Sequence, residues 1–171
     1  MTSMRRSLTL SLAMLTSLAL VSCAPPDPKQ ELQLSDVEGY WVVDTSLGTT
    51  QRISPAIRFT LTNKAAKRPI QATVTFRHKD EPDAEWGGAF LQVATAGKPL
   101  QIGERRVVVL IANSHYTTQG APEELFKHPD FKDPHAELFI RLGSSQWVKM
   151  AAVDMERRLG TRTLGEPPRA P

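Results

Sequence analysis

Two histidines and two aspartates lie close together in the segment HPDFKDPH, at His128, Asp130, Asp133 and His135. Imidazole nitrogens and carboxylate oxygens are donors that Zn²⁺ and Cu²⁺ accept. The His-x6-His spacing, however, places the two imidazoles on neither a single helix turn nor a single strand face. The segment is therefore either a metal- or small-ligand-binding loop, folded back on itself, or a surface loop whose aspartates cap turns.

A second polar segment, residues 78–85, carries carboxylates at Asp80, Glu81, Asp83 and Glu85. Carboxylate oxygens suit Ca²⁺, but an EF-hand loop needs ligands at alternating positions around a central glycine. The first glycines come only after this segment, so we interpret it as a solvated loop between two strands.

Motifs for nucleophilic, phosphate or zinc chemistry are absent from the sequence: there is no G-x-S-x-G, P-loop, G-x-G-x-x-G or H-E-x-x-H pattern. We therefore expect that the chain is not an enzyme and uses no cofactor.

Several aromatic residues stand among polar ones and could contact a partner. Tyr116, Phe126 and Phe131 lie in the irregular stretch 113–135, and Trp86 precedes a glycine pair. Such a mixture is typical of protein-interaction hot spots. The alternative is that these rings close one end of the domain. The three tryptophans are expected to pack in the core or on a sheet face and not to form a sugar-binding platform, and Trp86 is the best candidate for exposure.

The elements that would position these residues are strands, because apolar residues alternate with polar ones along most of the chain. The clearest runs are residues 40–44, 56–62, 70–77, 86–95, 105–112, 136–142 and 146–153. The runs 56–62 and 70–77 predict a hairpin or adjacent strands, and 105–112, apolar on both faces, predicts a central or covered strand. One short helix is expected at 122–128, opened by Pro122. About seven short strands predict an all-β, antiparallel β-sandwich, with a small β-barrel as the alternative.

The first 22 residues look like a targeting segment. Two arginines precede an apolar run of 14 residues, Leu8 to Val21, which is shorter than the roughly 20 needed to span a bilayer. The run ends in Leu20-Val21-Ser22-Cys23, which resembles the lipobox of bacterial lipoproteins in all four positions. This resemblance implies that Cys23, the sole cysteine, receives a lipid and becomes the first residue after cleavage.

Lipid attachment would tether the chain to a membrane without spanning it. The resemblance, with Ala24 and not Asp after the cysteine, implies the outer membrane of the cell envelope, facing the periplasm. The expected organisation is a signal peptide at 1–22, the lipidated cysteine and a proline-rich linker at 23–35, a folded domain at 36–159 and a disordered tail at 160–171.

Charge argues against a nucleic-acid partner. The chain has 21 Lys and Arg against 18 Asp and Glu, and the two signal-segment arginines leave 19 against 18. A nearly neutral domain offers no electrostatic attraction to phosphates.

Within the domain, Phe59 to Asn63, Pro99-Leu100-Gln101-Ile102-Gly103 and Val107 to Leu110 resemble small immunoglobulin-like domains of bacterial lipoproteins. The resemblance covers about half the domain. The expected anchor, the linker, the near-neutral charge and the missing catalytic motifs favour a non-catalytic envelope module that binds a protein partner or supports assembly. The alternative is metal or small-ligand binding through residues 128–135.

Overall fold

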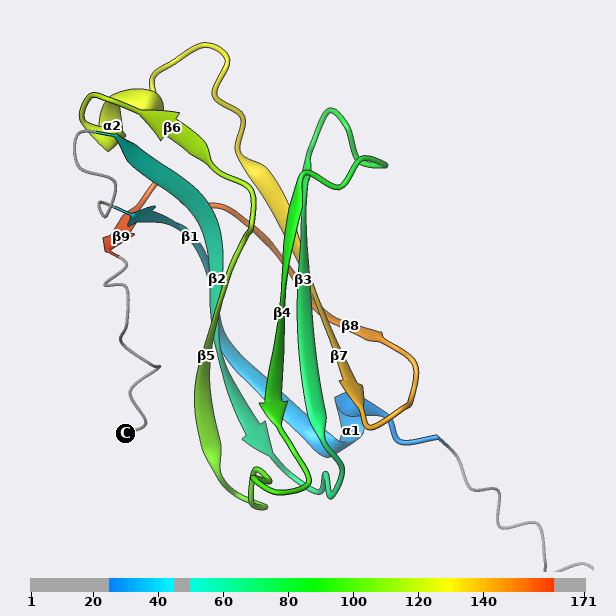
Figure 1. Cartoon of the computed structure of the whole chain (residues 1–171). Coiled ribbons are helices and arrows are strands. Elements are labelled where there is room, and N and C mark those ends of the chain that lie inside the picture. Colours follow the sequence, from blue (N-terminus) through cyan, green and yellow to red (C-terminus); the bar gives the residue numbers. More distant parts are fainter. Residues whose placement is uncertain (1–24, 45–49, 162–171) are drawn as a thin grey trace, which may run out of the picture.

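The computed structural model describes residues 25–44 and 50–161. The targeting segment, Cys23 and nearly all of the expected tail lie outside the described residues, so lipid attachment stays a prediction. Figure 1 shows two layers of strands that run along one long axis, with loops at both ends.

The described chain forms nine strands and two single-turn helices. The strands are β1 (Leu32–Asp44), β2 (Gln51–Asn63), β3 (Ile70–His78), β4 (Gly87–Ala94), β5 (Arg105–Ile111), β6 (Tyr116–Thr118), β7 (Pro134–Leu142), β8 (Val148–Asp154) and β9 (Leu159–Thr161). The helices are α1 (Pro28–Glu31) and α2 (Pro122–Leu125).

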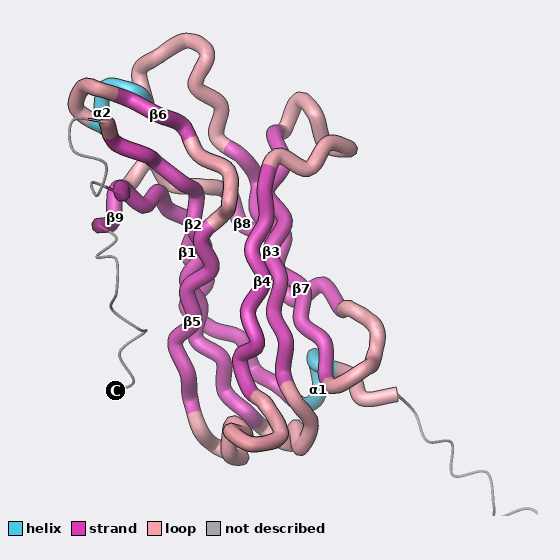
Figure 2. Tube along the Cα trace, viewed as in Figure 1, coloured by secondary structure: helices cyan, strands magenta, loops and turns pink. Residues whose placement is uncertain are grey.

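The strands divide into two sheets that pack face to face (Figure 2). Sheet A has the order β5-β2-β1-β9, and β6 pairs with the far end of β2. Sheet B has the order β4-β3-β7-β8. Every pair is antiparallel except β1 with β9. The predicted all-β sandwich is thus confirmed, with two separate sheets where the barrel alternative requires one closed sheet.

The core lies between the sheets and follows the period-two patterns. In β3, Ile70, Ala72, Val74 and Phe76 are buried, while the residues between them are half exposed. The same alternation runs through β7, and from sheet A the fully buried Phe59 meets this layer. Side chains at every second position share one face of a strand, so the sequence pattern alone identifies the buried face.

Two predictions about strand neighbours are wrong. The runs 56–62 and 70–77 do not form a hairpin, because β2 belongs to sheet A and β3 to sheet B. The run 105–112 is not central: β5 is the edge of sheet A, and Val107 on its outer face is 37% exposed. Alternation predicts which way a side chain faces, but strand pairing depends on contacts between distant parts of the chain.

The folded domain begins earlier than residue 36. The Asp27 carboxylate accepts a 3.0 Å hydrogen bond from the Lys29 amide and so caps α1, and β1 starts at Leu32, which is 2% exposed. The expected linker is therefore shorter than 23–35. The alternation of Leu32 and Leu34 was the sequence signal for this first part of β1.

The end of the domain also differs from the expectation. We expected disorder from residue 160, but β9 runs from Leu159 to Thr161 and pairs in parallel with Trp41 to Val43 of β1. The predicted helix at 122–128 is present but shorter: α2 begins at Pro122, and its last residue is Leu125.

Asn63, at the end of β2, ties two loops together. Its side-chain Nδ2 donates to the carbonyl oxygens of Ala66 at 2.8 Å and Leu100 at 2.7 Å, and its Oδ1 accepts from the Ala66 amide at 2.7 Å. The Gly103 amide donates to the Asn63 carbonyl at 2.7 Å. The loop 95–104 is thereby fastened to the loop 64–69.

These loops belong to the end of the sandwich that carries α1 (Figure 1). The Lys64 amide donates to the Glu31 carbonyl of α1 at 2.9 Å, and the Gly143 amide donates to the Pro69 carbonyl at 2.8 Å. We call α1 with loops 64–69, 95–104 and 143–147 the α1 end. The opposite end, with α2 and loops 79–86 and 112–133, is the α2 end.

Candidate functional site

Aromatic rings fill the α2 end of the core around Trp41, which is fully buried. The ring of Trp41 lies 5.0 Å from that of Phe131, 6.0 Å from Phe126, 5.9 Å from Tyr116 and 6.4 Å from Trp86, centroid to centroid. All these pairs are tilted, an arrangement that favours contact between ring edges and faces.

This packing decides between the two interpretations of the aromatic residues. Phe126 and Phe131 are 8% and 7% exposed, and Tyr116 and Trp86 are half-buried. Burial raises the pKa of the Tyr116 hydroxyl. The rings close one end of the core, and Phe126 and Phe131 are too deeply buried to form an exposed contact surface.

The four proposed metal ligands do not converge. The Asp133 carboxylate binds the Arg157 guanidinium at 2.8 Å, and His135 Nδ1 lies 2.8 Å from Asp154 Oδ1. His128 and Asp130 are exposed neighbours on the loop, 3.8 Å apart. Within the described residues, no group of three or more His, Cys, Asp or Glu side chains could hold a metal ion. Tertiary contacts thus give Asp133 and His135 partners other than each other.

The acidic loop after β3 is held by cations. The Arg77 guanidinium donates to the Pro82 and Asp83 carbonyls at 3.1 and 3.2 Å. The Asp80 carboxylate accepts a hydrogen bond from the Lys132 ammonium, which lowers the pKa of Asp80 below its usual range. The loop is a folded, ion-paired connection to the α2 end.

A pocket of about 170 Å³ lies beside β1 and β2, and Asp44, Ser54 and His115 are among its lining residues. These are the residue types of a catalytic triad. Within the described part of the chain, however, Ser54 and His115 form no hydrogen bond with each other. A serine nucleophile is activated through such a bond to its base, and this pair does not show one.

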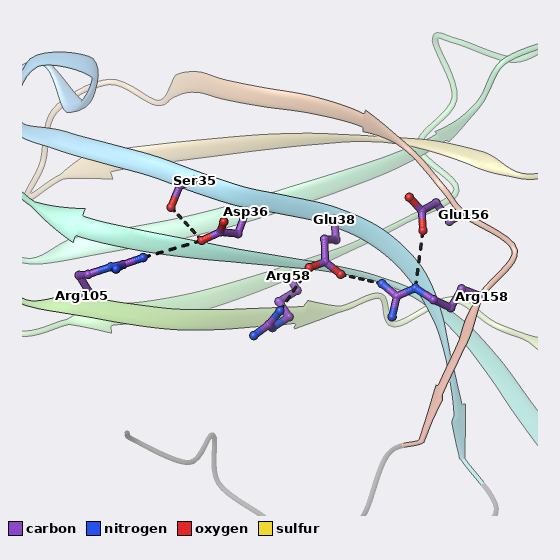
Figure 3. A network of polar contacts seen from close by, with 7 residues as sticks. All are labelled: Ser35, Asp36, Glu38, Arg58, Arg105, Glu156 and Arg158. Atoms are coloured by element: carbon purple, nitrogen blue, oxygen red, sulfur yellow. Dashed lines mark hydrogen bonds and ion pairs between the residues drawn. The ribbon is translucent and has the colours of Figure 1, made fainter.

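Charged residues cross the outer face of sheet A in the network that Figure 3 shows. Glu38 of β1 pairs with Arg58 at 3.2 Å and with Arg158 at 2.6 Å. Asp36, at a β-bulge with φ of 52°, accepts hydrogen bonds from Thr60 and Ser35, which lower the pKa of its carboxyl. The carboxylates of this network have partners within the sandwich, which fits a structural role.

The exposed aromatic residues lie elsewhere, on the outer face of sheet B. Phe90 of β4 is 57% exposed, and Trp147, just before β8, is 37% exposed. Their ring centroids are 6.4 Å apart with the planes at 84°. Trp147 thus reaches over the sheet towards β4 at its opposite edge.

A chain of hydrogen bonds supports the rings from below. The Arg141 guanidinium stacks on Trp147, 4.6 Å from the ring centroid, and its Nε donates to the Gln71 side chain. Gln71 Nε2 donates to Gln92 Oε1 at 2.8 Å, and Gln92 Nε2 donates to the Ala94 carbonyl at 2.7 Å. The cation is held in place over the ring, where it attracts the π electrons. We call Phe90, Trp147, Arg141, Gln71 and Gln92 the aromatic face.

The aromatic face adjoins a strand edge. β4 is an edge of sheet B, and its sequence GGAFLQVA has neither charge nor proline. Its Leu91 is 37% exposed. Most edge strands carry charges or prolines that discourage another strand from pairing. In β4, backbone groups are instead bonded within the domain. Gly88 exchanges hydrogen bonds with Asn113, and the Val93 carbonyl accepts one from the Arg106 guanidinium at 2.6 Å.

Sequence reasoning missed this face. The sequence did contain a pattern for most of this face. In β4, Phe90 and Gln92 share one side of the strand. In β3 and β7, Gln71 and Arg141 alternate with core residues. Trp147 lies in the loop just before β8, whereas the sequence pattern places it inside a strand at 146–153. The tryptophan expected to be exposed, Trp86, is instead part of the aromatic end of the core.

Comparison with known proteins adds no assignment: no protein-family model matches the chain, and no curated protein is similar to it. In the part of the chain that the structure describes, no helix has the length and apolar character to cross a bilayer.

Proposed function

We propose that this chain is a membrane-tethered, non-catalytic lipoprotein of the cell envelope that binds a protein partner through the aromatic face. The tether is the lipid expected on Cys23, and the expected location is the outer membrane, facing the periplasm. We also retain the immunoglobulin-like arrangement of the sandwich as part of this proposal.

The observation that carries the proposal is the exposure of Phe90 and Trp147, whose rings are in contact on the outer face of sheet B. Tryptophan and arginine are enriched among residues that contribute most to binding between proteins. Arg141 is already ordered by Gln71 and by the Trp147 ring, so a partner would not have to immobilise that side chain. The alternative of metal binding at 128–135 has no such support, because His135 and Asp133 already have other partners.

The test is recovery of a partner from detergent-solubilised, crosslinked envelopes with a tagged full-length chain. Phe90→Ala and Trp147→Ala should each reduce recovery of a stoichiometric partner, while the melting temperature changes by less than about 3 °C, as expected for exposed side chains. Val107→Ala is the matched control: Val107 is as exposed as Trp147, at 37%, but lies on sheet A.

The proposal is wrong if the tagged wild-type chain is repeatedly recovered without a partner protein. It is also wrong if Val107→Ala reduces recovery as much as the two aromatic substitutions, because the loss would then not depend on the aromatic face.

A further inference from the structure

We propose that the α1 end of the sandwich rests on the anionic lipid headgroups of the membrane that anchors the chain. This inference depends on the lipid anchor of the proposed function. It adds which surface of the domain meets the membrane.

Exposed cations gather at the α1 end. Its loops carry Lys64, Lys67, Arg68 and Lys98, and all four are exposed. Within the described part of the chain, none of the four forms an ion pair. The single acidic residue of these loops, Glu104, binds Arg106 of β5 at 2.7 Å. The loops therefore have a net charge of +3, and Lys29 and Glu31 of α1 leave the total for this end unchanged.

The α2 end has the opposite charge. Loops 79–86 and 112–133 contain eight acidic residues and three lysines, a net charge of −5 with neutral histidines. The near-neutral total therefore conceals a separation of charge along the long axis. An anionic bilayer, whose surface potential is negative, attracts the α1 end and repels the α2 end.

The loop that carries Lys98 also has an exposed apolar side chain. Residues 101–104 form a tight turn in which the Glu104 amide donates to the Gln101 carbonyl at 2.9 Å, and Gly103 has a φ of 84°. The turn leaves Ile102 at its tip, 61% exposed. A single exposed apolar residue is ordinary, but apolar and cationic side chains together suit the boundary between headgroups and acyl chains.

The position of the anchor fits this orientation. The helix α1 is at the same end of the sandwich as the cationic loops (Figure 1). Only five residue steps separate Cys23 from Pro28, the first residue of α1. A fully extended chain spans at most about 18 Å over that distance. A lipid on Cys23 therefore keeps these cations near the membrane, where each contributes about fivefold to partitioning onto an anionic surface.

The test measures which lysines the membrane protects. The full chain, purified in detergent from the membranes of producing cells, is reconstituted into vesicles of phosphatidylcholine alone or with about one third phosphatidylglycerol. Acylation by a membrane-impermeant reagent is followed at each lysine by mass spectrometry. Lys127 is the internal control, because it is exposed and lies at the α2 end.

We expect acylation of Lys64, Lys67 and Lys98 to slow about fivefold or more with phosphatidylglycerol, and acylation of Lys127 to change little. Salt at about 1 M should remove the protection, because it screens charges beyond about 3 Å. The double substitution K64E/K67E should restore acylation of Lys98, whereas the control K127E should not.

Equal rates in the two kinds of vesicle, or protection of Lys127 as strong as that of Lys98, would overturn the inference and leave the anchor intact. Flotation separates the two proposals. A chain that fails to float with neutral vesicles has no lipid anchor, and that result would refute the tether and this inference together.

Discussion

The side-chain amide of Asn63 donates a hydrogen bond of 2.7 Å to the carbonyl oxygen of Leu100, 37 residues later in the chain. Asn63 is 1% exposed, and Leu100 is 3% exposed. Their contact joins the end of β2 to the segment that holds Pro99 and Leu100. It also holds the loops of the α1 end in place.

Asn63→Ala should therefore destabilise the domain strongly. It leaves the Ala66 amide and the Ala66 and Leu100 carbonyls without their partner, and each unsatisfied buried group costs about 1–3 kcal/mol. For three such groups we expect a total loss of about 3 kcal/mol or more in urea unfolding. Asn113→Ala is the control, because Asn113 is exposed and accepts one bond, from the Gly88 amide. Equal losses in the two variants would contradict a structural role for Asn63.

Phe59→Ala tests the core. Phe59 is fully buried in β2, and truncation of a buried phenylalanine costs about 3–5 kcal/mol. From alternation alone, Thr60→Ala should do little. The structure modifies that expectation, because Thr60 is only 6% exposed and hydrogen-bonds to Asp36. We expect a loss of about 1 kcal/mol for Thr60→Ala. Denaturant unfolding measures the loss in both variants. Equal losses would contradict the assignment of Phe59 and Thr60 to opposite faces of β2.

Phe131→Ala should lower stability and not partner recovery. Its ring contacts Trp41, Phe126 and Tyr116, so its removal opens a cavity at a cost of about 3–5 kcal/mol. Tyr116→Ala should cost less, because Tyr116 is half-buried. Thermal unfolding measures both effects. An unchanged melting temperature together with lost partner recovery would instead make these residues a contact surface.

The pair of Glu137 and Lys149 should make stability depend on acid pH. The hydrogen bond from Lys149 holds the pKa of Glu137 below its usual range. The stabilisation of the fold by this ion pair is therefore complete above the unfolded-state pKa of about 4.3, and it is lost as the pH falls through the lower pKa of the folded state. Because Lys149 is half exposed, the contribution at neutral pH is below about 1 kcal/mol.

Unfolding free energies measured from pH 7 to about 3 check this prediction. Glu137→Gln should be slightly less stable than wild type at neutral pH, and the difference should vanish towards the acid end. Glu123→Gln, at an exposed carboxylate without an ion pair in the described chain, is the control. A difference that does not change with pH would refute the prediction.

Cys23→Ala should abolish lipid attachment. The reason is the fit of Leu20 to Cys23 to the lipobox, in which the cysteine thiol is the acceptor. Metabolic labelling with palmitate should mark the wild-type chain and leave the variant unlabelled. Equal labelling of both chains would rule out the lipoprotein interpretation.

Most of the sandwich could be predicted from alternation, because a residue's side of a strand depends only on its position along that strand. Which strands lie next to each other in a sheet could not be predicted in this way. β5 has apolar residues on both faces, as a central strand does, yet it is an edge. β1 was predicted to start at Tyr40, but it starts at Leu32 because Leu32 pairs with Asn63. Pairing of this kind joins residues far apart in sequence.

By itself, the sequence determined the all-β class and the buried faces of β3 and β7, since both depend on local composition or period; the targeting segment stays a prediction. Only the tertiary structure decided which aromatic residues are exposed and which charged residues form ion pairs. It placed Phe131 inside and Trp147 outside, gave Asp133 and His135 partners other than a metal, and collected the unpaired lysines at one end. The physical reason is that exposure and pairing of a side chain are properties of its neighbours in space, and in a sandwich those neighbours come from other strands.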